Sequence, residues 1–159
     1  MKKLIVIPLL SCILLLSSCG GLSELSFVTI GEQTIAANGL DPTSRIEVVT
    51  QTPSSIQGIS PVDLSALQSV DYSEDVAFVV SFGYGGSTVT RISQLKALTG
   101  NSTIWVKTNI PESTKDTGFL RYQIVTVKRA QIFRRGSVLV RLLGSIHHDK
   151  GTVIFSNRY

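Results

Sequence analysis

Apolar positions alternate with polar ones along most of the chain, in short runs rich in Val, Ile, Thr and Ser. A period of two places apolar side chains on one face of a β-strand, and the Gly, Asn and Pro residues between the runs are typical of turns. The pattern predicts a mainly β fold, a single β-sandwich or partly open barrel with one short helix. We expect about eight strands, at residues 26–30, 45–50, 76–82, 87–95, 103–109, 120–128, 137–143 and 152–156.

The run at 76–82 has the pattern of a central strand. Its even positions, which include Phe78 and Phe82, place large apolar side chains on one face. The odd positions are also mostly apolar, as in strands covered on both faces. Because side chains alternate, Ser81 should point away from the two phenylalanines.

One segment before this strand has a different pattern. Pro61 begins it, Asp63 follows near the start, and Leu64 and Leu67 are separated by three positions. A proline in the first turn, an early acidic residue and this spacing predict a helical turn or short helix. Residues 51–60 and 110–118 have the composition of loops.

The N-terminus carries a second, more specific pattern. Lys2 and Lys3 precede an apolar run at 4–16, which leads into Leu-Ser-Ser-Cys ending at Cys19. This is the layout of a bacterial lipoprotein signal peptide with its lipobox. A membrane-spanning helix takes about 20 apolar residues, and this run is shorter. We therefore expect residues 1–18 to be cleaved and the Cys19 thiol to carry a diacylglycerol.

Lipid attachment at Cys19 predicts the location of the protein. Each buried methylene of an acyl chain contributes about 0.8 kcal/mol, so two or three chains hold a protein firmly on a bilayer. We expect a membrane-anchored lipoprotein of the cell envelope that faces outside the cytoplasm. Gly20 is not the aspartate that retains lipoproteins at the inner membrane of Gram-negative bacteria, so the outer membrane is expected there. Residues 19–25 would form a lipidated tether and residues 26–159 a single β-rich domain.

Size and charge fit that description. Removal of residues 1–18 from the 159 leaves 141, enough for one domain with a core. Cys12 leaves with the signal peptide and Cys19 is acylated, so no thiol remains for a disulfide, a metal or a nucleophile. Loss of two lysines lowers Lys+Arg from 15 to 13 against 11 acidic residues, so the net charge falls from +4 to +2. This balance does not indicate a nucleic-acid partner.

His147 and His148 are the two histidines of the chain, and Asp149 follows them. Neighbouring strand residues point to opposite faces, and no further His or Cys completes a zinc shell, so a solvated hairpin turn is the favoured interpretation. A hydrolase would use one of these histidines as its base, but no serine stands in a nucleophile elbow. The sequence predicts no enzyme activity, catalytic residue, metal or cofactor.

Two further segments have candidate binding chemistry. The glycines at 83–86 lack the spacing of a phosphate-binding loop and indicate a turn between strands. The basic stretch at 128–135, together with Arg141, is expected to be a solvated hairpin with basic ends. The alternative is contact with anionic lipid headgroups, at about 1 kcal/mol per charge near the surface.

Residues 70–83, with the sequence VDYSEDVAFVVSFG, resemble the PrcB-like protease-complex lipoprotein family. In that family a D-F/Y-S turn precedes a buried strand and a TGGY turn. Segments 27–30, 103–108 and 121–128 resemble further family strands in the expected order, so the resemblance covers residues 26–129. The chain departs from the family at residues 84–87, which read YGGS, and at Arg121, which replaces a proline. The region 53–68 also lacks the family's tryptophan, and residues 130–159 lie beyond the match.

The resemblance implies a noncatalytic accessory protein, sometimes associated with a secreted protease. We therefore expect a lipid-anchored, extracytoplasmic accessory or partner-binding module that attaches to the membrane through Cys19. A structural envelope lipoprotein that binds glycan or lipid is one alternative, and an exported hydrolase is another. Cys19 is the one functional residue that the sequence assigns.

Overall fold

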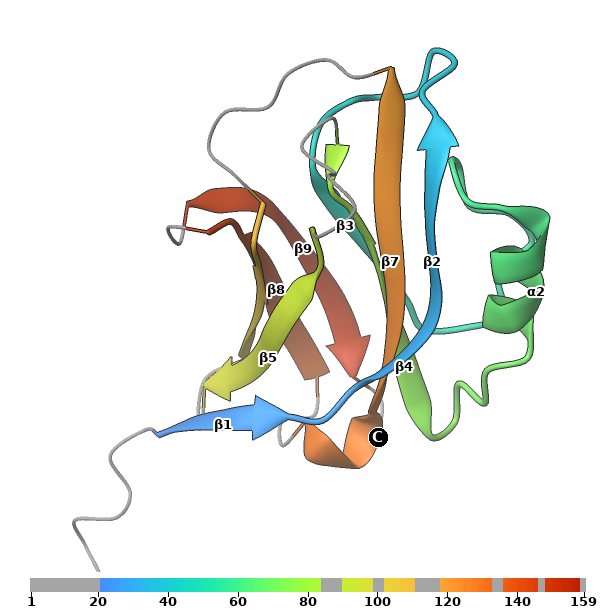
Figure 1. The fold of residues 1–159 in the computed structure, drawn as a ribbon. Coiled ribbons are helices and arrows are strands. Elements are labelled where there is room, and N and C mark those ends of the chain that lie inside the picture. Colours follow the sequence, from blue (N-terminus) through green and yellow to red (C-terminus); the bar gives the residue numbers. More distant parts are fainter. Residues whose placement is uncertain are drawn as a thin grey trace, which may run out of the picture.

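The computed structural model describes residues 21–83, 90–98, 102–110, 118–132, 136–145 and 148–157. In these ranges the chain forms nine strands, one α-helix and one 3-10 helix (Figure 1), which confirms the mainly β fold class. The elements are β1 (Leu22–Leu25), β2 (Val28–Ala36), β3 (Arg45–Val49), α2 (Pro61–Gln68), β4 (Asp75–Ser81), β5 (Ile92–Leu98), β6 (Thr103–Thr108), β7 (Phe119–Lys128), η3 (Arg129–Gln131), β8 (Gly136–Leu143) and β9 (Asp149–Asn157).

The strands form two sheets that pack face to face. One has the order β1-β5-β6-β8-β9 and the other has the order β2-β7-β4-β3. All the pairings are antiparallel except the parallel pair β6 and β8. The chain crosses between the sheets at Ser26 and Phe27, and α2 covers the outer face of the four-stranded sheet (Figure 1). The two separate sheets make the fold a β-sandwich rather than a closed barrel.

The main core lies between the sheets and includes one face of β4. Phe78 and Phe82 are fully buried there, and the Phe78 ring meets the Phe155 ring edge to face with centroids 6.3 Å apart. Strand β4 lies between β7 and β3. Ser81 lies on the opposite face, beside Val79, and is partly exposed. The prediction of a central strand with these two faces is confirmed.

A smaller apolar cluster lies between α2 and the outer face of the four-stranded sheet. Leu67 of α2 is fully buried there against Ala77 and Val79 of β4 and Ile124 of β7. The odd positions of β4 are apolar because they form this second cluster. The helix has the bounds that the sequence predicts, and residues 51–60 form the expected loop before it.

The strand boundaries differ from the prediction near the two ends of the chain and at β5. The predicted strand at 87–95 is wrong at residues 90 and 91, and β5 runs from Ile92 to Leu98 because its last residues pair with β1. Strand β1 occupies residues 22–25, which the sequence analysis assigns to the tether. Leu25 is buried and pairs with Leu95 of β5, and this contact between distant residues makes the segment a strand. Strand β2 continues to Ala36, well beyond the predicted end at residue 30, because it pairs with β7 along its length. Strand β9 begins at Asp149 rather than at residue 152.

Candidate functional site

A polar network joins the N-terminus of α2 to the four-stranded sheet. The Ser60 hydroxyl oxygen accepts a hydrogen bond from the Asp63 backbone N–H at 3.1 Å, and the hydroxyl donates to the Asp63 carboxylate at 2.9 Å. The Tyr122 hydroxyl donates to the same carboxylate oxygen at 2.5 Å and accepts from the Ser60 backbone N–H at 2.9 Å. The Gln33 side-chain amide donates to the Ser60 hydroxyl oxygen at 3.1 Å.

Serine, aspartate and tyrosine are residue types found in catalytic sites, but this network caps the N-terminus of α2, with the Ser60 backbone N–H donating to Tyr122 rather than to Asp63. The N-cap Ser60 satisfies the N–H of the third helical residue, and Asp63 at that third position binds back to the cap. Asp63 and Tyr122 are 6% and 2% exposed, so the network lies inside the protein. Burial, followed by the hydrogen bond to Asp63, raises the pKa of Tyr122. The network therefore fixes the helix on the sheet.

Gly31 in β2 makes room for this network. A Cβ atom at this position would lie 2.5 Å from the Asp63 carboxylate oxygen, closer than a real Cβ contact. The capping signal, a serine three positions before an aspartate, is present in the sequence. Sequence reasoning noted Asp63 only as an early acidic residue and missed its contacts with Tyr122 and Gly31.

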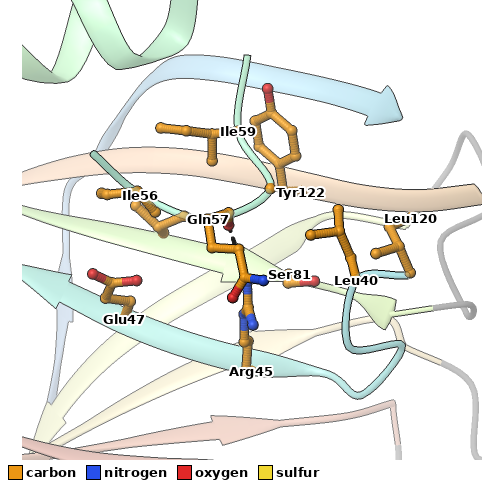
Figure 2. Close-up of a pocket in the computed structure, with 11 residues that line it drawn as sticks. Leu40, Arg45, Glu47, Ile56, Gln57, Ile59, Ser81, Leu120 and Tyr122 are labelled. Atoms are coloured by element: carbon orange, nitrogen blue, oxygen red, sulfur yellow. Dashed lines mark hydrogen bonds between the residues drawn. The ribbon is translucent and has the colours of Figure 1, made fainter. Parts of the chain in front are cut away.

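A small cavity lies next to the network, between the loop at 51–60 and the outer face of the sheet (Figure 2). Arg45 points toward the loop, and its guanidinium donates to the Gln57 carbonyl oxygen at 3.0 Å. The volume open to the centre of a water molecule is about 20 Å³, which is room for about one water. This cavity is a packing gap under the loop.

The predicted histidine turn lies in the hairpin between β8 and β9. The Gly144 N–H donates to the His148 carbonyl oxygen at 2.9 Å, while His147 lies outside the described residues. The Arg141 guanidinium donates to the Asp149 carboxylate at 2.8 Å. Partial burial raises the pKa of Asp149, but hydrogen bonds, led by the one from Arg141, outweigh it and hold this pKa below its usual value. In the described part of the chain, no three His, Cys, Asp or Glu side chains gather as metal ligands.

The basic stretch at 128–135 is not the solvated hairpin that the sequence predicts. Lys128 donates to the Asp75 carboxylate at 3.0 Å, and Arg129 is buried, with 5% of its surface exposed. Residues 133–135 lie outside the described ranges. Arg129 is the first residue of η3, and its guanidinium donates to carbonyl oxygens of Thr50, Tyr72 and Asp75. Arg129 is therefore not part of an exposed basic patch, and Lys128 and Arg141 are each paired with an acid.

The other sequence candidates lie near the borders of the described ranges. Gly83 has a φ of 62°, and a Cβ there would lie 2.2 Å from the Pro42 carbonyl oxygen, so this position requires glycine. The other residues of the predicted turn at 83–86 lie outside the described residues, as does Cys19. No helix in the described ranges is long and apolar enough to cross a membrane.

Strand β2 is an edge strand with an exposed surface. It comes first in the order of the four-stranded sheet, so one side of its backbone has no neighbouring strand among the described residues. Val28, Glu32 and Thr34 are exposed, and Val28 exposes 64% of its surface. Unpaired N–H and C=O groups of an edge strand can pair with a strand from another chain. Glu32 forms an ion pair with Arg121 at 2.8 Å beside this edge.

Comparison of the chain with protein-family models, with curated proteins and with solved structures finds no match. The resemblance to the PrcB-like family therefore stays a prediction.

Proposed function

We propose that this protein is a lipid-anchored accessory protein of the cell envelope that binds a partner protein, with a secreted protease complex as the candidate assembly. The observation that carries the proposal is the lipobox that ends at Cys19, followed by a mainly β domain. The resemblance of residues 26–129 to the PrcB-like family supports the role of accessory protein.

The start of β1 gives the anchor a short connection to the domain. Leu22 begins β1 three residues after Cys19. A fully extended chain spans at most about 3.6 Å per residue, so the lipidated residue would lie within about 11 Å of the sandwich. The domain would therefore stay close to the membrane surface, where a second envelope protein meets it at high local concentration.

The β2 edge is the surface that we assign to the partner. Its backbone can accept an extended segment of a partner protein as an additional strand, in the manner of β-strand addition. The exposed side chains of Val28 and Thr34 would contact that segment. Ser60, Asp63 and Tyr122, which resemble catalytic residues by type, hold the helix in place, and this supports a binding role.

Site-specific crosslinking in the native envelope tests the proposal. A photoreactive amino acid replaces Thr34 on β2, and a second variant carries it at Ile154 on β9, which is also exposed and lies in the other sheet. We expect a protein adduct from position 34 and not from position 154, identified by mass spectrometry. Adducts with only peptidoglycan or lipid at position 34 would contradict the proposal and favour a structural lipoprotein.

A screen for turnover tests the competing class. The mature protein is incubated with peptide and ester substrates, and the proposal expects no activity that depends on the histidines. Turnover that is abolished by His147→Ala or His148→Ala would contradict the noncatalytic role and indicate an exported hydrolase.

A further inference from the structure

Arg129 is a buried cation surrounded by neutral hydrogen-bond acceptors. Its Nε donates to the carbonyl oxygens of Tyr72 and Asp75, each at 3.0 Å. Its Nη2 donates to the Thr50 carbonyl oxygen at 3.2 Å, and its Nη1 donates to the Asn157 side-chain oxygen at 3.2 Å. The guanidinium thus joins the ends of β3, β4 and β9.

The positive charge of Arg129 has no acidic counterpart in the described part of the chain. None of the three ion pairs there includes Arg129, and the nearby Asp75 carboxylate accepts from Lys128 instead. Burying a cation is costly unless it is paired and hydrogen-bonded. The neutral oxygens satisfy part of its hydrogen-bonding capacity and leave the charge without an anion.

Two N–H groups of the Arg129 guanidinium are not used by these hydrogen bonds. An arginine side chain has five N–H groups. The hydrogen bonds with described residues engage the single N–H on Nε and one N–H on each terminal nitrogen. One N–H on Nη1 and one on Nη2 therefore remain. Two such N–H groups match the two oxygens of a carboxylate.

A cavity borders Arg129. Arg129 lines it together with Thr50, Gln51 and Ser156, and the volume open to the centre of a water molecule is about 170 Å³. Gln51 and Ser156 are both exposed, so they stand where a ligand would enter from solvent. Their amide and hydroxyl groups are additional hydrogen-bond donors for an anion.

We propose that Arg129, Gln51 and Ser156 form a binding site for a carboxylate group at the end of the sandwich where β3, η3 and β9 meet. The guanidinium supplies the charge, and the two exposed side chains donate to the carboxylate from the entrance. A free small carboxylic acid and the carboxyl terminus of a peptide share this chemistry.

Titration of the mature lipidated protein in a nonionic detergent tests the site. The probes are acetate, a short alanine peptide with a free carboxyl terminus, and the same peptide amidated, all at constant ionic strength. We expect saturable binding of acetate and of the free peptide, and none of the amidated peptide. Peptide binding about tenfold tighter than acetate binding would identify a peptide terminus as the ligand, and equal affinities would identify the carboxylate alone.

Substitutions test whether the measured binding occurs at the proposed site. Arg129→Lys keeps the positive charge but cannot donate two parallel hydrogen bonds to one carboxylate. The affinity for acetate should therefore fall about tenfold. Gln51→Ala and Ser156→Ala change exposed residues and should also weaken binding, which keeps the test decisive if Arg129→Lys does not fold. Lys128→Ala removes the neighbouring exposed cation and should leave the affinity unchanged. No saturable response in the wild type, equal binding of the amidated peptide, or unchanged affinity in Gln51→Ala and Ser156→Ala would overturn the proposal.

Discussion

Truncating Phe78 to alanine tests the packing of the sandwich at its centre. The side chain is fully buried in β4, its strand is held between β7 and β3, and its ring meets Phe155 edge to face. Since strands flank it on both sides, the surrounding structure can collapse only partly into the space left by the ring. Phe78→Ala should therefore lower the free energy of unfolding strongly.

The expected magnitude follows from the burial of the ring. A fully buried Phe→Ala substitution costs about 3–5 kcal/mol, of which the aromatic pair accounts for about 0.5–1.5 kcal/mol. Domains have stabilities of about 5–15 kcal/mol, so this loss is a large fraction of the total. For a domain of this size each kcal/mol shifts Tm by about 2–4 °C, so Tm should fall by about 6–20 °C.

Thermal unfolding of soluble variants without residues 1–19, followed by circular dichroism, measures this effect. Phe119→Ala removes the same ring from a position that is 53% exposed, and Ser81→Ala changes the other face of β4. Ser81→Ala should alter the free energy of unfolding by less than about 0.5 kcal/mol, and Phe119→Ala should cost clearly less than Phe78→Ala. A Phe78→Ala protein that melts with the wild type would refute the assignment of β4 as a buried inner strand.

Three further predictions concern single contacts. Gly31→Ala places a Cβ 2.5 Å from the Asp63 carboxylate oxygen and should cost about 1–3 kcal/mol in chemical denaturation, whereas Gly21→Ala, with open space around it, should cost far less. Burial raises the pKa of Tyr72 to about 12, so its phenolate absorbance should appear only near that pH. Stability should fall as the pH rises above 10, where the unfolded chain ionises first. The pKa of Asp149 should rise in an NMR titration when alanine replaces its arginine partner. The wild-type contribution of this pair is present above the unfolded pKa of about 3.9 and is lost as the pH falls through the lower folded pKa.

Local patterns predicted the elements that local chemistry determines. The helix at 61–68 was predictable because Pro61 and the spacing of its leucines act within the segment. The two faces of β4 followed from alternation alone. Strand β1 was not predicted, because the segment has four residues and becomes a strand by pairing with β5 some 70 residues later in the chain. The parallel pairing of β6 and β8 could not be predicted from the sequence either. Hydrophobic periodicity shows which face of a strand is buried, but not which strand lies beside it.

The functional residues divide in the same way. Cys19 is proposed from the sequence alone, because a lipoprotein signal sequence is a linear motif. Arg129 belongs to a basic run in the sequence, and its burial depends on carbonyl oxygens from Thr50, Tyr72 and Asp75, which distant elements bring together. No sequence pattern marks such a site, because backbone oxygens are present at every residue.

Lipid attachment at Cys19 is the central claim, and labelling of cells with a clickable fatty acid tests it most directly. The wild-type protein should carry the label, and Cys19→Ser should not, because a serine hydroxyl lacks the thiol that accepts the diacylglyceryl group. Cys12→Ser, the matched control at the other cysteine of the chain, should keep the label. The precursor of Cys19→Ser should also remain uncleaved at the larger mass. Equal labelling of the wild type and Cys19→Ser would contradict the account.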